Sequence, residues 1–157
     1  MLAKVRHTLG QRLSKIPAAL LAKTGLSPNA LTLIGFAVTL GTAWVLSTGR
    51  FLLGGFLVLF SGAFDFLDGA LARATGSSTK FGAFLDSTLD RFSDAALFLG
   101  LLAYYASLGS HYTEIVLIGA ALTGSLITSY TRARAEGLGL KDEVGLFTRT
   151  ERIILLA

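Results

Sequence analysis

Four apolar stretches dominate the pattern of hydrophobic and polar positions along the chain, at residues 30–48, 51–71, 92–108 and 112–131. Each is close to the length of about 20 residues that an α-helix needs to cross the hydrocarbon core of a bilayer. The pattern therefore predicts four transmembrane helices. The connections at residues 48–50 and 109–112 are short, so the helices that they join should run antiparallel. A fifth apolar run begins at Ile153 and stops at the last residue, which predicts a chain truncated at its C-terminus.

The first 23 residues follow a different period. Apolar side chains recur there at steps of three and four, at Leu2, Val5, Leu9, Leu13, Ile16 and Leu20. The five Lys and Arg residues of this segment fall largely on other faces. This is typical of an amphipathic helix in the membrane interface with its basic side chains toward the headgroups. A packed cytosolic helix is the alternative, and Pro17 predicts a kink or break.

Together these patterns predict an all-α integral membrane protein, a polytopic bundle of transmembrane helices preceded by an interfacial amphipathic helix. We expect an N-terminal juxtamembrane segment at residues 1–25. We expect a transmembrane domain at residues 26–157, with four spans and the start of a fifth.

Charge adds an orientation and a class of partner. Of 14 Lys and Arg residues, only Arg50 falls in a loop opposite to the others, so the N-terminus and the segments around residues 73–91 and 132–152 should face the cytoplasm. The net charge of +4 comes without any nucleic-acid motif, which favours anionic lipids and phosphorylated substrates as partners. The chain has no cysteine, so a metal would need oxygen or imidazole ligands. We expect a multi-pass protein of the cell membrane.

Four aspartates stand in this apolar context in the pattern DxxDGxxAR, eight residues, then GxxxDxxxD. Intramembrane carboxylates are costly and are functional candidates by default. Asp65 and Asp68 lie three residues apart, and Asp86 and Asp90 four apart, so each pair would share one face of a helix. Two such helices predict a site for two Mg²⁺ or Mn²⁺ ions, and two ions suit a diphosphate substrate. The alternative is a set of salt bridges at a helix end.

Residues next to the aspartates point to a phosphate-containing ligand. Arg73 can meet a phosphate in a bidentate way that lysine cannot copy. Gly69 and Gly82 leave bare patches beside Asp68 and Asp86 through which a substrate can approach the backbone. Thr79 and Lys80, in the polar connection, could add a hydroxyl and a charge.

With these residues the chain resembles the CDP-alcohol phosphotransferase family of integral membrane enzymes. The signature is matched without departure at Asp65, Asp68, Gly69, Ala72, Arg73, Gly82, Asp86 and Asp90. The resemblance extends from about Pro28 to the end of the chain. It implies transfer of a phosphatidyl-type group from a CDP-linked lipid to an alcohol, with release of CMP.

The resemblance also implies roles for individual residues. The four aspartates would hold two divalent cations, and Asp90 would also act as the general base that deprotonates the acceptor hydroxyl. Gly69, Arg73 and Thr79 would contact the CDP portion. The segment from Asn29 to Thr32 would approach CDP from the first span. Equally, Ser27 or Asn29 would simply cap the first helix, with Pro28 in its first turn.

The acceptor depends on arginines after the fourth span. Arg132, Arg149 and Arg152 are candidate ligands for an acceptor that itself carries a phosphate, although positive-inside anchoring is the alternative reading. The blocks PNxxTxxG, which includes Gly35, and RAxAE resemble phosphatidylinositol phosphate synthases and their archaeal relatives. Phosphatidylglycerophosphate synthases usually carry arginine at the position of Gly35. We therefore expect inositol 1-phosphate as acceptor, with glycerol 3-phosphate as the alternative, and a possible homodimer as in relatives.

Two other functional classes stay open at this point. A cation-conducting protein could line a path with aspartates, but it would not need Arg73, Gly69 and Gly82 at these offsets. An inactive scaffold would bind CDP-lipid without turnover. Members of the resembled family usually have more spans than are predicted here, which again indicates a truncated chain.

Overall fold

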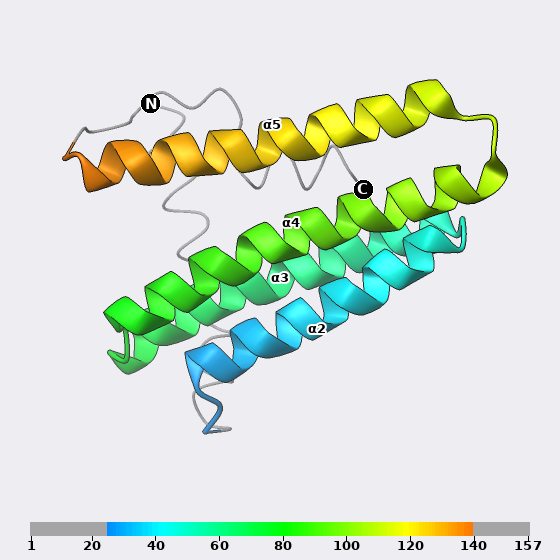
Figure 1. The fold of residues 1–157 in the computed structure, drawn as a ribbon. Helices are drawn as coiled ribbons and strands as arrows, with labels where there is room; N and C mark the ends of the chain where they lie inside the picture. Colours follow the sequence, from blue (N-terminus) through cyan, green and yellow to red (C-terminus); the bar gives the residue numbers. More distant parts are fainter. Residues whose placement is uncertain (1–24, 140–157) are drawn as a thin grey trace, which may run out of the picture.

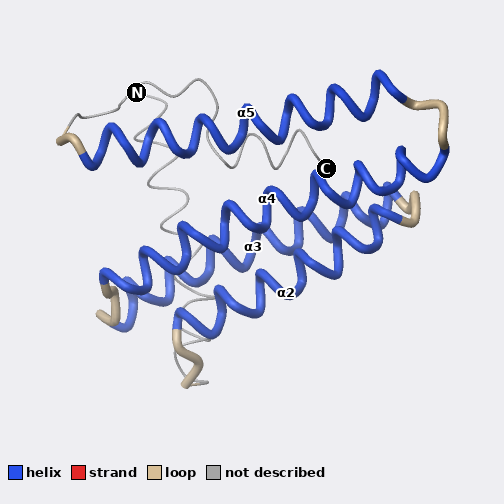
Figure 2. The backbone as a smooth tube through the Cα atoms, in the orientation of Figure 1, coloured by secondary structure: helices blue, strands red, loops and turns tan. Residues whose placement is uncertain are grey.

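The computed structural model describes residues 25–139, and all the regular secondary structure in this part of the chain is helical. Figures 1 and 2 show its four long helices, α2 (Pro28–Ser47), α3 (Phe51–Thr75), α4 (Lys80–Leu108) and α5 (Tyr112–Gly137). The all-α prediction is confirmed. The predicted amphipathic helix at residues 2–23 and the apolar run from Ile153 lie outside the described residues.

Local sequence explains where the helices begin and end. Ser27 caps α2 by accepting a hydrogen bond at Oγ from the Ala30 amide at 3.2 Å, and Pro28 takes the first helical position. Gly76 ends α3 with φ of 63°, a left-handed conformation that glycine adopts without strain. The predicted connection at residues 48–50 is confirmed, and the other hairpin connection is residues 109–111, one residue shorter than expected.

The helices extend further into the polar segment than the apolar pattern predicts. The second predicted span stops at residue 71, whereas α3 continues to Thr75, and α4 begins at Lys80 rather than near residue 92. The pattern misses these turns because it follows hydropathy, and backbone hydrogen bonding continues where the side chains become charged. All four aspartates therefore lie on helices, separated by a connection of residues 76–79 only.

Three of the four helices, α2, α3 and α5, are long and apolar enough to cross a membrane. The helix α4 has 29 residues, about 43 Å at the helical rise, so it is long enough as well. Its composition does not place it among these three apolar helices, and it carries Asp86, Asp90 and Asp94. The fourth predicted span, the C-terminal part of α4, stays a prediction.

Helix α2 packs against both α3 and α4, while α5 packs against α4. Close approach of α2 and α4 depends on Gly100, where an added Cβ would lie 3.0 Å from the Cα of Ala43. Leu46, Val58 and Leu97 form a buried cluster in the half of the bundle distant from residues 76–79. Helix α2 thus holds the two aspartate-bearing helices in place.

Candidate active site

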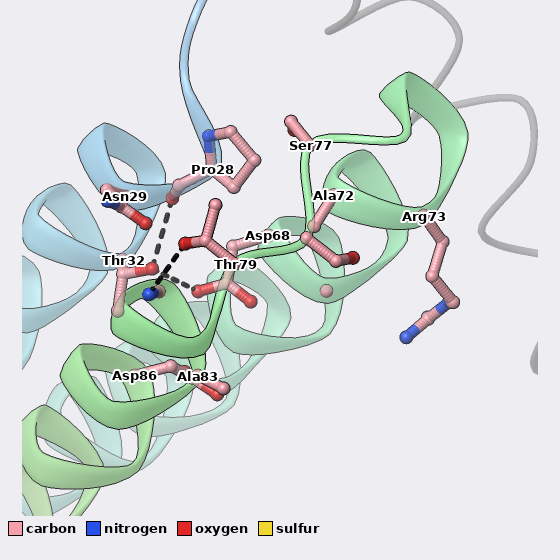
Figure 3. A pocket seen from close by; sticks show the side chains of 13 residues that line it. Pro28, Asn29, Thr32, Asp68, Ala72, Arg73, Ser77, Thr79, Ala83 and Asp86 are labelled. Atoms are coloured by element: carbon pink, nitrogen blue, oxygen red, sulfur yellow. Dashed lines mark hydrogen bonds between the residues drawn. The ribbon is translucent and has the colours of Figure 1, made fainter.

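A cavity of about 180 Å³ lies where α2 begins, α3 ends and α4 begins. Its walls include two aspartates, one arginine and several small or hydroxyl-bearing residues, shown in Figure 3: Pro28, Asn29, Thr32, Asp68, Gly69, Ala72, Arg73, Ser77, Ser78, Thr79, Gly82, Ala83 and Asp86. Most residues that the sequence singles out therefore lie around one space.

Asp68 is the most deeply placed acid of the cavity, with 4% of its surface exposed. The Thr32 hydroxyl donates to Oδ2 of Asp68 at 2.7 Å, and the carbonyl of Pro28 lies 3.0 Å from the same hydroxyl. A hydroxyl has one hydrogen to donate, and the shorter contact is the one to the carboxylate. This bond ties α2 to α3 and fixes the orientation of Asp68 (Figure 3).

The other three aspartates are less buried than Asp68. Asp86 shares the cavity wall with it, and the charges of Asp86 and Asp65 both act on its carboxylate. Asp65 lies beside α2, where Oδ1 would be 3.8 Å from a Cβ added at Gly35. Asp90 is half-buried, one turn beyond Asp86.

The set of donors suits a hard divalent cation, because it consists of carboxylate oxygens with no sulfur. Asp68 and Asp86 face one cavity from two helices. In the described part of the chain, no three acidic or imidazole groups are gathered closely enough to hold one ion. Carboxylates repel one another, so closer approach of all four needs positive charge between them.

Arg73 and two glycines shape the space around these acids. The Arg73 guanidinium folds toward Gly69, with Nη1 3.4 Å from the position that a Cβ would take there. At Gly82 an added Cβ would lie 3.0 Å from both Oδ1 of Asn29 and Oγ1 of Thr79. A side chain at either glycine would therefore crowd polar groups that line the cavity.

The structure shows which residues cap α2 and α4 beside the cavity. Ser27 is the cap of α2, whereas Asn29 lines the cavity, so Asn29 is not needed as a cap. Thr79 lines the cavity and also caps α4, because its Oγ1 accepts the Gly82 amide at 2.9 Å.

Of the three predicted acceptor arginines, the structure describes Arg132. Arg132 is half-buried on α5 and does not line the cavity. Arg149 and Arg152 lie outside the described residues.

Sequence reasoning missed several polar residues near the site. Ser77 and Ser78 line the cavity from the connection between α3 and α4. Asp94 is buried and accepts a hydrogen bond from Ser125 at 3.1 Å, which links α4 to α5. A signal for Asp94 was present, because it continues the four-residue spacing of Asp86 and Asp90 along α4.

Comparison with known proteins assigns the chain to one family. The family profile described as CDP-alcohol phosphatidyltransferase matches residues 25–155. An archaetidylinositol phosphate synthase of Pyrococcus horikoshii is 41% identical over 99% of this chain and 80% of its own length.

Solved structures agree with this assignment. The phosphatidylinositol phosphate synthase of Mycobacterium tuberculosis with CDP-DAG bound superposes with a TM-score of 0.81 at 36% identity, over 92% of this chain and 73% of that chain. The same enzyme in complex with manganese and citrate superposes with a TM-score of 0.83 at 37% identity, over 90% and 68% of the two chains.

Proposed function

Since the chain belongs to the CDP-alcohol phosphatidyltransferase family, we propose that it transfers a phosphatidyl-type group from a CDP-linked lipid to inositol 1-phosphate and releases CMP. One observation carries the proposal: Asp68, Asp86 and Arg73 line one cavity between three helices, beside glycines that leave it open. Relatives named for inositol phosphate lipids, at about 40% identity, support the acceptor.

The reaction needs one new bond and one broken bond. The acceptor hydroxyl oxygen attacks the phosphorus that carries the lipid, the bond from that phosphorus to the CMP oxygen breaks, and CMP leaves with the electron pair. The hydroxyl proton passes to the Asp90 carboxylate, which we propose as general base. Asp90 suits this role because it lies on α4 beyond the cavity wall that Asp86 forms.

Asp65, Asp68, Asp86 and Asp90 are the residues that we propose to hold two divalent cations. When bound, Mg²⁺ or Mn²⁺ would neutralise the diphosphate and the leaving group. The protein's own contribution is orientation, because the Thr32 hydroxyl fixes Asp68 at 2.7 Å. The manganese complex of the mycobacterial relative supports a divalent cation in this family.

The cavity wall suggests how the CDP portion is held. Arg73 would pair with the diphosphate, and Gly69 lets the phosphates approach the backbone of α3. Asn29, Thr32 and Thr79 offer amide and hydroxyl groups from the opposite side of the cavity. The mycobacterial relative with CDP-DAG bound supports a CDP-lipid as donor.

For the acceptor we propose that Arg132, Arg149 and Arg152 bind its phosphate, because arginine pairs well with phosphate oxygens. Gly35 on α2 also bears on the identity of the acceptor. An arginine there would meet Phe64, whose Cβ would lie 2.9 Å from the added Cβ, and the carboxylate of Asp65. Gly35 has no side chain, so α2 places no cation at this position beside Asp65.

The acceptor is tested by measuring CMP release from CDP-diacylglycerol with Mg²⁺ or Mn²⁺ and a panel of inositol 1-phosphate, glycerol 3-phosphate, inositol and serine. We expect release that depends on inositol 1-phosphate. CMP release only with glycerol 3-phosphate would overturn the proposed acceptor but would support the proposed type of reaction. Binding of CDP-lipid without release under any condition would identify a scaffold, and cation flux in vesicles a conducting protein.

We further propose that the cavity and the N-terminus face the cytoplasm, that anionic lipids surround the basic segments, and that the protein forms a homodimer. The distribution of Lys and Arg supports the orientation. Because the chain has no cysteine, Ser78→Cys gives a single thiol at the cavity rim. A membrane-impermeant thiol reagent should label it in inside-out vesicles and not in right-side-out cells.

A further inference from the structure

Ser125 is the one buried residue of α5 as described. Its hydroxyl donates to Oδ2 of Asp94 on α4 at 3.1 Å, and both residues are 8% exposed. Neither residue lines the cavity between α2, α3 and α4. Polar groups buried between two helices cost free energy unless they are hydrogen-bonded, so this bond favours the arrangement in which α4 and α5 meet at Asp94 and Ser125.

Within residues 25–139, few buried polar contacts of this kind join α5 to another helix. Among the described helices α5 packs against α4, and in Figure 1 the axes of the two helices diverge toward the C-terminal end of α5. Most other α5 side chains are exposed or half-buried. The Ser125 to Asp94 bond therefore defines which face of α5 is turned toward α4.

Helix geometry connects this face to the proposed acceptor site. Arg132 follows Ser125 by seven residues, which places it about 10 Å further along α5 and within about 20° of the same direction. Asp90 precedes Asp94 by one turn, about 6 Å along α4. The two helices run antiparallel, so both steps lead toward the same end of the bundle (Figure 1). Arg132 is half-buried, as expected for a side chain on the face turned toward α4.

We propose that Asp94 and Ser125 are positioning residues that set the rotation of α5 and thereby hold Arg132 toward α4, where it can bind the phosphate of the acceptor. The inference rests on the proposed function, because it takes Arg132 to be an acceptor ligand. It predicts that losing the hydrogen bond weakens acceptor binding specifically. The donor site and the chemical step, which depend on α2, α3 and α4, should be spared.

The first test is the kinetics of Ser125→Ala. We expect the KM for inositol 1-phosphate to rise about three- to tenfold, the order expected for the loss of one typical intramolecular hydrogen bond. The KM for CDP-lipid and kcat should stay within about twofold. Ser125→Thr, which keeps the hydroxyl, should restore the acceptor KM. Thr128→Ala is the matched control, because the Thr128 hydroxyl bonds only to Gly124 O of its own helix, at 2.7 Å.

If binding of both substrates and kcat were impaired to the same extent, Ser125 would be merely structural. An unchanged KM for the acceptor would also overturn the proposal. Asp94→Asn, which keeps shape and an acceptor oxygen, should show the same pattern more weakly. In the Arg132→Ala background, Ser125→Ala should have no further effect on the acceptor KM. Additive effects in the double variant would contradict action through Arg132.

A second measurement separates this inference from the proposed function. Spin labels at Phe84→Cys on α4 and Ala133→Cys on α5, both exposed positions, report the helix positions in the full chain without turnover. Ser125→Ala should shift or broaden their distance distribution, and Thr128→Ala should not. No shift overturns the positioning role even if the enzyme is active. A shift in a protein whose wild type releases no CMP with inositol 1-phosphate supports the positioning role and rejects the acceptor.

Discussion

At the end of the bundle where α2 begins and α3 ends, a hydrogen bond between polar side chains joins α2 to α3 beside buried apolar residues such as Leu71, whereas the other end is joined by aromatic and aliphatic contacts. The cavity end has the Thr32 to Asp68 bond and the bare patch at Gly82. The far end, the half of the bundle near residues 48–50 and 109–111, has the Leu46 cluster and the Tyr104 ring set edge-on to Phe51 at 4.8 Å.

Stability and chemistry are divided between the two ends of the bundle. Apolar packing at the far end holds the three helices without any help from the acids. The cavity end can then place Asp68 and Asp86 near one another, an arrangement that costs free energy through like-charge repulsion. Substitutions at the cavity end should therefore affect turnover, and substitutions at the far end should affect stability.

The largest effect should come from Asp90→Asn. Loss of a general base lowers kcat by about 10²- to 10⁴-fold. CDP-lipid binding, measured by ligand-induced thermal shift, should survive, and the unfolding temperature should change little. The assay is repeated at saturating Mn²⁺, because recovery there would show that Asp90 is only a metal ligand. Near-normal turnover under standard conditions would reject both roles.

Thr32→Val should have the next largest effect. It removes the hydroxyl that orients Asp68, and loss of such a partner lowers metal affinity by about 10- to 100-fold. The Mg²⁺ or Mn²⁺ concentration for half-maximal activity should rise accordingly. Thr42→Val is the matched control, since Thr42 is also buried on α2 but its hydroxyl bonds to Val38 O within its own helix. Equal shifts in the two variants would contradict the special role of Thr32.

At the far end, Gly100→Ala should destabilise the protein. The added Cβ would press on the Ala43 backbone, and overpacking of this kind costs about 1–3 kcal/mol. Thermal unfolding in detergent measures the loss, and kcat per folded molecule should not change. Gly119→Ala has open space around the added Cβ and serves as control. A fall in kcat without a fall in stability would break the division between the two ends.

Tyr104→Leu should give the smallest effect. It loses the edge contact with Phe51, and an aromatic pair contributes about 0.5–1.5 kcal/mol beyond its buried area. We expect a slightly lower unfolding temperature and unchanged KM values for both substrates. Tyr112→Leu, at an 80% exposed position, should be neutral. A changed acceptor KM in Tyr104→Leu would show that the two ends communicate.

Sequence reasoning predicted the parts of this molecule that depend on local pattern. The helices, the connection at residues 48–50 and the placing of Asp68, Gly69 and Arg73 at one cavity follow from hydropathy and spacing. It missed the packing of α2 against both α3 and α4, because a strongly apolar helix carries no sign of which partner each face meets.

The hydrogen bonds that the sequence did not predict have the same physical origin. The Thr32 to Asp68 bond joins residues 36 apart, and the Ser125 to Asp94 bond joins residues 31 apart. No periodic pattern in the sequence indicates these pairs, because each bond depends on how two helices cross. The depths of Asp65 and Asp90 relative to Asp68 likewise follow from helix rotation, which spacing within one helix does not determine.

The contacts of α2 have a consequence for the order in which the protein is made. Synthesis proceeds from the N-terminus, so α2 enters the membrane before either aspartate-bearing helix. When α3 follows, Thr32 is already available to receive Asp68, and Ala43 is in place for Gly100 when α4 arrives. Helix α2 therefore acts as a template on which the charged helices assemble, and Asp68 meets its partner Thr32 as soon as α3 joins α2.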